Sequence, residues 1–506
     1  MPTDNGFTDN GQTRSSWLNV GPPALQPLGQ DVETDVCVVG AGISGLTTAY
    51  LLLKKGKRVA ILDDGPIAGG DSCRTSAHLA SELDDYYHEI ENIFSEGAAK
   101  LVYESHSTAI DTIERISREE NIDCDFVRLD GYLFTPTGEG TEELDTELEA
   151  AHRAGFADAE KIERAPLSTF DTGPCLRFPH QGQFHPLKYL AGLARCIERD
   201  GGKFYKAHAK NVEGGEQPHV ETIEGNMVRA SAIVVATNSP INDRLKIHTK
   251  QHPYRTYMVG LKITGEIPLG LYWDTLDPYH YARVQTDENI LIVGGEDHKT
   301  GQEDDAEDRW SAIEEWTRER FPVGETVYRW SGQVMETVDG LAFIGHNNGE
   351  NDPVYIATGD SGMGMTHGTI AGILLSDLIC GRENPWQQIY DPQRKAVKAA
   401  RDWVEENLNV AAQYVDLVTG GDVADESEIA RGEGAIIRQG AKKIAVYCDD
   451  AGEFHRCSAI CPHLGAVVQW NSAEKSWDCP AHGSRFRAED GKPVNSPSSA
   501  PLAPVE

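Results

Sequence analysis

Two cysteines and two histidines near the carboxyl end of the chain have the types and the spacing of metal ligands. Cys461 and His463 form a CxH pair, and Cys479 and His482 form a CxxH pair. Such a set can bind one zinc ion, or a [2Fe-2S] cluster with the cysteines on one iron and the histidines on the other, or no metal. Structural zinc sites favour CxxC pairs, so the spacing favours the cluster.

The residues around these pairs indicate a small all-β domain. Residues 428–506 consist of short β-like runs separated by Gly, Asp and Asn turns, too short for a helical domain. With its motifs CPHLG and CPAHG, this stretch resembles a Rieske domain over nearly its whole length. The resemblance implies a [2Fe-2S] cluster with one iron on Cys461 and Cys479 and the other on His463 and His482.

The same resemblance predicts the surroundings of the cluster. Ser484 matches a serine that donates a hydrogen bond to the cluster in respiratory Rieske proteins, and Phe486 replaces a tyrosine that donates another. Ala466 and Ala481 stand where those proteins have a disulfide. Fewer donors stabilise the reduced cluster less, so we expect a potential within roughly −150 to +300 mV and below its upper end.

A second group of residues, near the amino end, has the spacing of a dinucleotide site. In DVCVVGAGISGL a β-rich run meets GxGxxG and continues into a helical face. Gly40 permits a tight turn, Gly42 lets the backbone approach a pyrophosphate, and Gly45 lets the helix pack on the strand. The alternative is a glycine-rich turn in an ordinary βαβ crossover.

The neighbours of these glycines would complete the dinucleotide site. Ile43 and Ser44 begin the helix, where backbone N–H groups and the helix dipole favour phosphate. Asp63, with Asp64 after it, ends the next strand where an acid binds a ribose hydroxyl.

The loop after the second strand favours FAD over a nicotinamide nucleotide. A nicotinamide dehydrogenase would normally continue with βα units, but here AGGDSCRTSAHL leads into helical sequence. The loop resembles that of the D-amino-acid-oxidase-like, or DAO-type, FAD-dependent oxidoreductases. The resemblance implies that Arg74, Thr75 and Ser76 wrap the flavin side of FAD. It also implies that Thr237 ends a strand returning to the nucleotide-binding sheet, and that Val212 approaches the adenine.

A segment between residues 336 and 381 resembles the second flavin motif of this family. ETVDGLAFIG is followed by ATGDSGMGMT and an uncharged helix, whose N-terminus would stabilise negative charge on the reduced ring. A buried glycine-rich turn without a ligand is the alternative. Some relatives attach FAD through a cysteine near the place of Gly332, so we expect non-covalent FAD. The resemblance implies flavin contacts from Gly362, Met363, Gly364, Met365 and Thr366.

Candidate catalytic residues lie between and within these motifs. From residue 271 onward, apolar and polar residues alternate as in a half-buried sheet, which predicts a substrate subdomain. His280 and Arg283 in this sheet, and His367 in the flavin motif, are the candidates for substrate contact. An ordinary sheet face is the alternative for the first two.

The motifs divide the chain into four parts. We expect a leader over 1–34, a DAO-type oxidoreductase over 35–410, a linker over 411–427 and a Rieske domain over 428–506. The FAD-binding parts would be about 35–85, 200–245 and 330–385, and residues 85–200 are expected to be mainly helical. The predicted fold is an α/β Rossmann-like FAD-binding domain with an α+β substrate subdomain, followed by an all-β Rieske domain.

Composition excludes several other classes. A formal charge of −34 over 506 residues, without a basic stripe, disfavours nucleic acid as a partner. No apolar run approaches the roughly 18 residues of a membrane span, and no targeting segment is apparent, so we expect a cytoplasmic protein.

The two cofactor motifs together predict a redox function. We expect an FAD-dependent oxidoreductase that oxidises an amine or amino acid by hydride transfer to FAD. It would then pass single electrons to the Rieske [2Fe-2S] cluster and to an external acceptor or redox partner protein. The alternatives are an electron-transfer component serving a partner oxygenase or biosynthetic enzyme, and a scaffold without cofactors.

Overall fold

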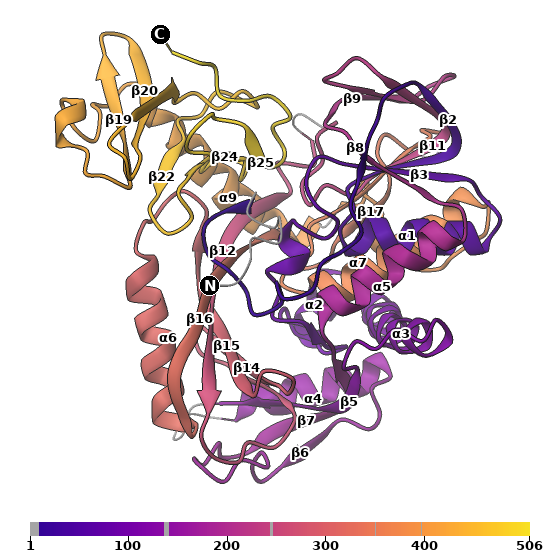
Figure 1. Ribbon diagram of the computed structural model, residues 1–506. Helices are drawn as coiled ribbons and strands as arrows, with labels where there is room; N and C mark the ends of the chain where they lie inside the picture. Colours follow the sequence, from indigo (N-terminus) through magenta and orange to yellow (C-terminus); the bar gives the residue numbers. More distant parts are fainter. Residues whose placement is uncertain (1–9, 136–140, 243–245, 350, 396, 506) are drawn as a thin grey trace.

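Two large mixed sheets and a small β domain make up the molecule (Figure 1). The computed structural model describes residues 10–135, 141–242, 246–349, 351–395 and 397–505. Within these residues no helix is long and apolar enough to cross a membrane.

The nucleotide-binding sheet is built around two parallel strands that are buried on both faces. Their runs VCVV and VAIL have no polar alternation, as central strands of a covered parallel sheet require. The strand order is β1-β8-β3-β2-β11-β10-β9, with β18 on β11 and β17 on β18. These strands are β1 Gln26–Pro27, β2 Val32–Val39, β3 Val59–Asp63, β8 Lys203–Lys206, β9 Ala209–Glu213, β10 His219–Thr222, β11 Met227–Val235, β17 Phe343–His346 and β18 Val354–Thr358.

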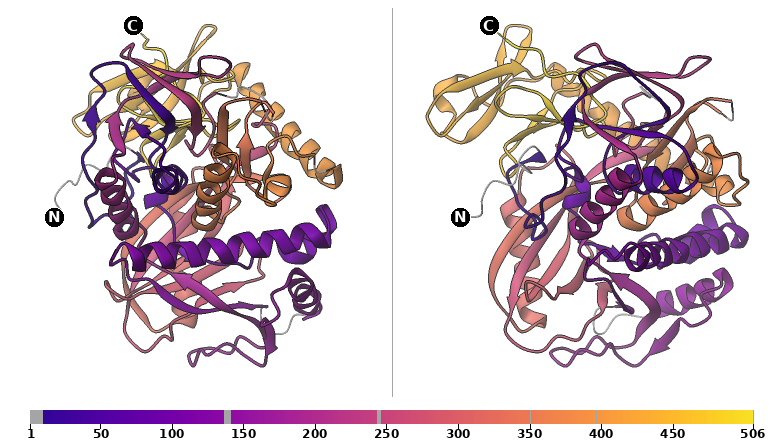
Figure 2. Two further views of the ribbon diagram at one scale, coloured as in Figure 1. Left: turned by 90° about the vertical axis from the view of Figure 1, so that its right-hand side faces the viewer. Right: turned by 45° about the vertical axis from the view of Figure 1, so that its right-hand side comes forward.

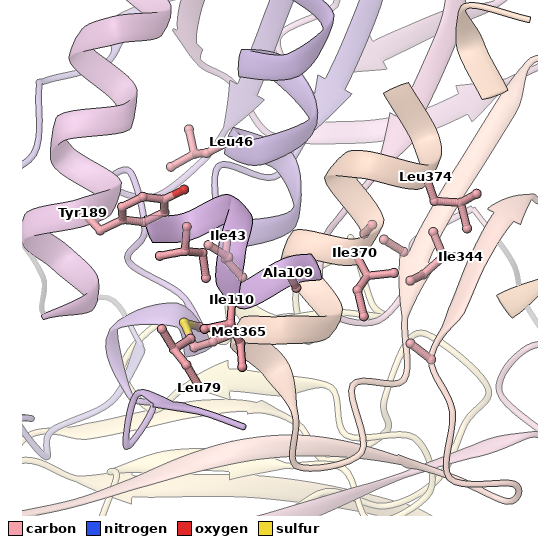
Figure 3. Packing of buried hydrophobic residues seen from close by; sticks show 14 of the residues in the cluster. Ile43, Leu46, Leu79, Ala109, Ile110, Tyr189, Ile344, Met365, Ile370 and Leu374 are labelled. Atoms are coloured by element: carbon pink, nitrogen blue, oxygen red, sulfur yellow. The ribbon is translucent and has the colours of Figure 1, made fainter. Parts of the chain in front are cut away.

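Helices cover one face of this sheet and share a single core (Figure 3). They are α1 Ile43–Lys54, α3 Glu96–Glu119, α5 Pro186–Arg199 and α7 Gly364–Ile379. Ile43 and Leu46 from α1 and Ile370 and Leu374 from α7 all belong to this core, and all four are buried. The core therefore holds the first and second flavin motifs together, although they are far apart in the sequence.

The second sheet forms the substrate subdomain, in the order β16-β12-β15-β14-β13-β5-β7-β4, with β6 on β7. Its strands are β4 His78–Leu79, β5 Val127–Phe134, β6 Glu160–Ile162, β7 Cys175–Gln183, β12 Gln251–Ile263, β13 Leu271–Asp274, β14 His280–Gln285, β15 Ile290–Lys299 and β16 Val323–Thr337. Helix α6 Ala306–Arg320 packs on β12, β15 and β16. Residues 85–200 thus contribute three strands to this sheet as well as α2 Tyr87–Ile93, α3, α4 Glu142–Ala154 and α5, so the expectation of a mainly helical segment was incomplete.

The carboxyl-terminal domain is all-β, as predicted, with two small antiparallel sheets. One contains β19 Glu433–Gln439, β20 Lys442–Cys448 and β21 Phe454–Ser458, and the other β22 Gln469–Asn471, β23 Ser476–Asp478, β24 Arg485–Arg487 and β25 Pro493–Asn495. Helices α8 Gln387–Tyr390 and α9 Ala400–Gln413 precede it. Figures 1 and 2 show this domain against the ends of both larger sheets.

The described part of the expected leader is integrated into the fold. Trp17 is fully buried, and its Nε1 donates a hydrogen bond to the carbonyl oxygen of Thr75 at 2.7 Å. Strand β1 extends the nucleotide-binding sheet through β8. This segment is polar and rich in proline, so its sequence shows no periodicity, and only the tertiary contacts reveal its place.

Candidate functional site

A cavity of about 770 Å³ connects the predicted FAD motifs. It begins at the ends of β2 and β3, passes the loop after β3 and reaches the turn before α7. Of the predicted FAD residues, fourteen line it: Gly40, Gly42, Ile43, Ser44, Asp63, Asp64, Arg74, Thr75, Ser76, Thr237, Gly362, Met363, Gly364 and Met365. Segments distant in sequence therefore converge on one elongated space.

Both helices that begin at the cavity have N-cap residues without a side-chain cap. Gly42 at the start of α1 and Met363 at the start of α7 provide none, and neither first turn contains an acidic residue. The Ile43 N–H of α1 donates to Ser72 Oγ at 3.1 Å. The other N–H groups of each first turn and the positive end of each helix dipole suit a pyrophosphate at α1 and a reduced flavin ring at α7. The polar groups of this cavity thus fit FAD.

Asp63, the acid expected at the nucleotide ribose, ends β3 and lines the cavity. Its Oδ2 accepts a hydrogen bond from the Ala41 N–H at 2.7 Å, and its Oδ1 accepts one from the Gly65 N–H at 2.8 Å. Burial, and then the neighbouring Asp64, raise the pKa of Asp63 to about 7. Each oxygen keeps a lone pair for a ribose hydroxyl.

Three predicted FAD residues do not line the cavity. Gly45 packs instead, because a Cβ there would lie 1.9 Å from the carbonyl oxygen of Gly40. Thr366 is buried and hydrogen-bonded to His106 and to the Met363 carbonyl. Val212 lies towards the end of β9, away from the cavity, whereas Ala209 at the start of the same strand lines it.

Several polar residues at the cavity escaped sequence analysis. Asp71 Oδ2 accepts hydrogen bonds from Asn238 at 2.8 Å and from Asn495 at 2.9 Å. His208 pairs with Asp64 at 2.6 Å and with the Ser499 carbonyl oxygen at 2.7 Å. Asn495 and Ser499 belong to the Rieske domain, so that domain forms part of the cavity wall.

Only one of the three catalytic candidates reaches the cavity. His367 lines it, with Nε2 3.2 Å from Nε2 of His106, and burial lowers its pKa to about 4. His280 does not line it, because its ring stacks on Trp316 at 4.6 Å and bonds Asp274. Arg283 is also outside, since it donates to carbonyl oxygens of Ala77 and Phe184 and holds the loop before β4 in place.

Two loops with the same backbone pattern bring the predicted metal ligands together. The N–H of Cys461 donates to the carbonyl oxygen of Ala466 at 2.9 Å, and that of Cys479 donates to Ser484 at 2.8 Å. In each loop a glycine with positive φ, Gly465 or Gly483, donates back to the cysteine carbonyl oxygen. The left-handed conformation explains why both motifs contain glycine at this place.

The four side chains form a thiol pair beside an imidazole pair. The Cys461 and Cys479 thiols hydrogen-bond each other, and backbone N–H groups of both loops point at the sulfurs. The rings of His463 and His482 lie 5.0 Å apart. Burial, followed by three nearby histidines, lowers the pKa of His482 to about 2, so it is the neutral imidazole that a metal requires.

This donor set fits a cluster with two protein ligands on each iron. Across the described part of the chain, no three His, Cys, Asp or Glu side chains gather as they would around one ion. A Rieske cluster requires only two ligands per iron. Ser484, the predicted donor, hydrogen-bonds Cys461 and accepts from the Ser498 N–H at 3.0 Å.

The loops that carry these ligands face the FAD-binding domain. The ring of His248 lies 4.7 Å from that of His463 and 5.7 Å from that of His482. Gln333 on β16 is buried and lines the cavity, and its Nε2 donates to the Gly483 carbonyl oxygen at 3.0 Å. One side chain therefore spans the distance between the cavity and a ligand loop.

Comparison with known proteins agrees with both halves of this arrangement. The model of the FAD dependent oxidoreductase family DAO matches residues 35–378, and that of the Rieske [2Fe-2S] domain matches residues 421–506. The chain is a member of the DAO family with a carboxyl-terminal Rieske domain. It is an FAD-dependent oxidoreductase, its DAO domain binds FAD, and its Rieske domain binds a [2Fe-2S] cluster. The predictions of family, fold class and cofactors are confirmed.

Individual relatives support the same conclusion. A Bacillus subtilis protein named as a Rieske 2Fe-2S iron-sulfur protein, YhfW, is 31% identical over 489 residues, which are 96% of each chain. The γ-glutamylputrescine oxidoreductase of Escherichia coli is 27% identical over 373 residues, with 70% of this chain and 85% of that protein covered.

Solved structures share the fold of the DAO part. Glycine oxidase from Geobacillus kaustophilus aligns with a TM-score of 0.61 at 19% identity, covering 72% of this chain and 99% of its own. The L-amino acid deaminase from Proteus vulgaris aligns with a TM-score of 0.61 at 18% identity, covering 74% of this chain and 100% of its own.

Proposed function

We propose that this DAO-family protein oxidises the C–N bond of an amine or amino acid and passes the electrons through its own Rieske cluster to an external acceptor. FAD, when bound, accepts two electrons as a hydride, whereas the cluster carries one electron at a time. The residues of the protein must orient the substrate, exclude water and hold the FAD and cluster sites close together.

The bridge through Gln333 carries this proposal. Its backbone N–H donates to Asp71 at 3.0 Å, its side chain donates to Gly483, and it is 2% exposed. A residue fixed at both ends, with the cavity on one side and a ligand loop on the other, keeps a short and dry path between the two cofactor sites. The sequence disfavours direct reduction by NAD(P)H, because we find in it no second dinucleotide fingerprint set between a strand and a helix.

A pair of matched glycine substitutions tests the electron path. Gly483 and Gly440 both have positive φ in the Rieske domain, at +79° and +62°. A Cβ on Gly483 would lie 2.5 Å from Cβ of Pro253 on β12 of the substrate sheet, whereas nothing lies within 4 Å of a Cβ on Gly440. Gly483→Ala should therefore displace the ligand loop, and Gly440→Ala should cost only the left-handed strain of about 1 kcal/mol.

The measurement is anaerobic mixing of the oxidised protein with amine and amino-acid substrates, with absorbance followed in the flavin and cluster bands. We expect flavin bleaching in the natural protein and both variants, followed by cluster reduction that is at least tenfold slower in Gly483→Ala alone. Cluster reduction at the same rate in all three proteins would refute the proposed path. A broad substrate panel that leaves the flavin oxidised would refute the proposed reaction.

A further inference from the structure

Carboxyl groups with unsatisfied oxygen atoms line the part of the cavity that the substrate sheet forms. Glu82, Asp84 and Asp297 line it. Glu82 is 2% exposed and its Oε1 has no hydrogen-bond partner; the buried Oδ1 of Asp297 also has none. Buried acceptors are normally satisfied, so two such oxygens at one cavity require a donor from a ligand or solvent.

Burial and mutual repulsion raise the pKa of these carboxyl groups and so favour their neutral form. Burial, and then Glu147 and Asp84, raise the pKa of Glu82 well above its usual range. Desolvation by the surrounding protein, and then Asp85 and Asp297, raise the pKa of Asp84, although its side chain is open to the cavity. A bound cation would supply the missing counter-charge and let the group ionise.

The same part of the cavity is rich in aromatic rings. Three aromatic rings line the cavity beside the carboxyl groups. They belong to Trp273 on β13, to Tyr281 on β14 and to Tyr279, which directly precedes β14. The rings of the two tyrosines lie 5.8 Å apart. Aromatic faces attract ammonium groups and contact aliphatic carbons, so carboxylates and rings together suit an alkylammonium ion.

No side chain in this part of the cavity suits the carboxylate of an amino acid. Among the described residues that line the cavity, the arginines and lysines are Arg74, Lys206, Arg487 and Lys492. Arg74 is bound to Glu474, and Lys206 lies beside Asp63 in the strand register. Arg487 and Lys492 are bound to Asp490 in the Rieske domain. A substrate carboxylate would meet three carboxyl groups and no cation, which costs binding energy.

We propose that this part of the cavity binds an aliphatic diamine that lacks a carboxylate on the carbon next to the reacting nitrogen. The inference rests on the proposed function and narrows its substrate class.

One ammonium group lies between the carboxylates and aromatic rings, and the other nitrogen is oxidised. That nitrogen first loses a proton to a cavity carboxylate or water. Its neighbouring carbon then gives a hydride to FAD, and water hydrolyses the resulting iminium ion to an aldehyde and ammonium. The one-electron acceptor of the proposed function removes the two electrons.

Binding is tested with two ligands that cannot be oxidised. The dication 2,5-diamino-2,5-dimethylhexane and the zwitterion 2-aminoisobutyrate both lack a hydrogen on the carbon next to nitrogen. We expect the dication to perturb the flavin absorbance of the FAD-loaded protein and to raise its melting temperature, and the zwitterion to do neither. Glu82→Gln should raise the dissociation constant of the dication at least about tenfold, since it removes one partner of a buried charge pair.

Control variants separate recognition from folding. Glu216→Gln makes the same chemical change at an exposed residue and should leave binding unchanged. Asp297→Asn provides a second variant at the site, and it should weaken binding of the dication as Glu82→Gln does. Equal or tighter binding of the zwitterion, or equal binding by Glu82→Gln and Glu216→Gln at unchanged flavin content, would overturn the inference.

Substrates that can be oxidised distinguish this inference from the proposed function. Anaerobic bleaching of the flavin by 1,4-diaminobutane, with no bleaching by glycine or L-proline, would support both. Bleaching by the amino acids alone would overturn the diamine inference and leave the proposed function standing. Bleaching by neither class would overturn the proposed function and, with it, the inference.

Discussion

Replacing Glu474 by glutamine should release the Rieske domain from the FAD-binding domain. Glu474 belongs to the turn between β22 and β23, and its side chain is completely buried. Its Oε1 lies 2.9 Å from Nη1 of Arg74 and 3.1 Å from Nη2 of Arg255. Ser331 donates to the same oxygen, and the Thr13 N–H donates to Oε2 at 3.1 Å. One carboxylate thus joins the Rieske domain, the flavin loop, the substrate sheet and the N-terminal segment.

The size of the effect follows from the pKa of this carboxyl group. Burial alone would raise it, but attraction to Arg74, Arg255 and Arg485 outweighs burial and lowers the pKa from 4.5 to about 2. One pKa unit is worth about 1.4 kcal/mol, so the ionised state stabilises the docked arrangement by about 3 kcal/mol. Removing one partner of a buried ion pair costs about 3–5 kcal/mol in other proteins, which agrees.

The arginines explain why glutamine cannot replace the charge. Burial, and then Arg485, lower the pKa of Arg255, and its Nε and Nη1 have no hydrogen-bond partner. Without the carboxylate, Arg255 would be buried beside other guanidinium groups with less counter-charge. We expect Glu474→Gln to lose about 3 kcal/mol, and Glu489→Gln, an exposed change in the same domain, to stay within about 0.5 kcal/mol.

Urea titration is the appropriate assay, with cluster circular dichroism and flavin fluorescence recorded in parallel because a two-domain chain need not unfold in one step. The pH dependence provides a second criterion. A carboxyl group whose pKa is lower in the folded protein stabilises the fold at pH values above its pKa in the unfolded chain. The natural protein should therefore lose this contribution as pH falls from about 5 towards 2. Glu474→Gln should not show this loss of stability over the same pH range. Equal midpoints for the natural protein and Glu474→Gln, with a shared acid profile, would refute the reasoning.

Four further outcomes are expected. Cys479→Ser should purify with little iron and sulfide but normal FAD, as metal analysis and flavin release would show; a full iron content would contradict the ligand assignment. Asp63→Asn should weaken FAD binding about tenfold or more, measured by fluorescence titration of the apoprotein, because the ribose hydroxyls lose a charged acceptor. Acid denaturation of the natural protein should leave all FAD in the supernatant, and yellow colour in the pellet would indicate a covalent bond. Ser496→Val should speed the dissociation of FAD, since Ser496 Oγ joins the Thr237 carbonyl to the Ser239 N–H at the cavity; an unchanged release rate would count against this contact.

Local motifs were predictable because their chemistry depends on spacing within a few residues. Cys461 and His463 lie on one loop, and Gly40 and Gly42 on one turn, so the sequence itself brings each set together. The two ligand loops also repeat one hydrogen-bond pattern around Gly465 and Gly483. Such patterns predicted the family, the cofactors and fourteen of the residues that line the cavity.

Residues that come together only through tertiary contacts were not predictable from spacing. Asp71, His208 and Asn495 have no motif, and they meet at the cavity only after two domains pack together. Val212 shows a second limit, since the expected strand end is present but the start of the strand, at Ala209, lines the cavity instead. His280 belongs to the predicted sheet, but its stacking on Trp316 could not be inferred from alternation alone.

The Rieske segment 495–499 links the two cofactor sites in a way that neither domain could achieve alone. Ser498 donates its N–H to Ser484, which hydrogen-bonds the cluster ligand Cys461. Two residues before it, Ser496 contacts Thr237 at the cavity, and one residue after it, Ser499 contacts His208. A shift of this short segment would therefore alter a hydrogen bond to the cluster and the wall of the FAD cavity together. Because Glu474 also fixes the same domain, through Arg74 and Arg255, the structure favours one docked position in which both centres are complete.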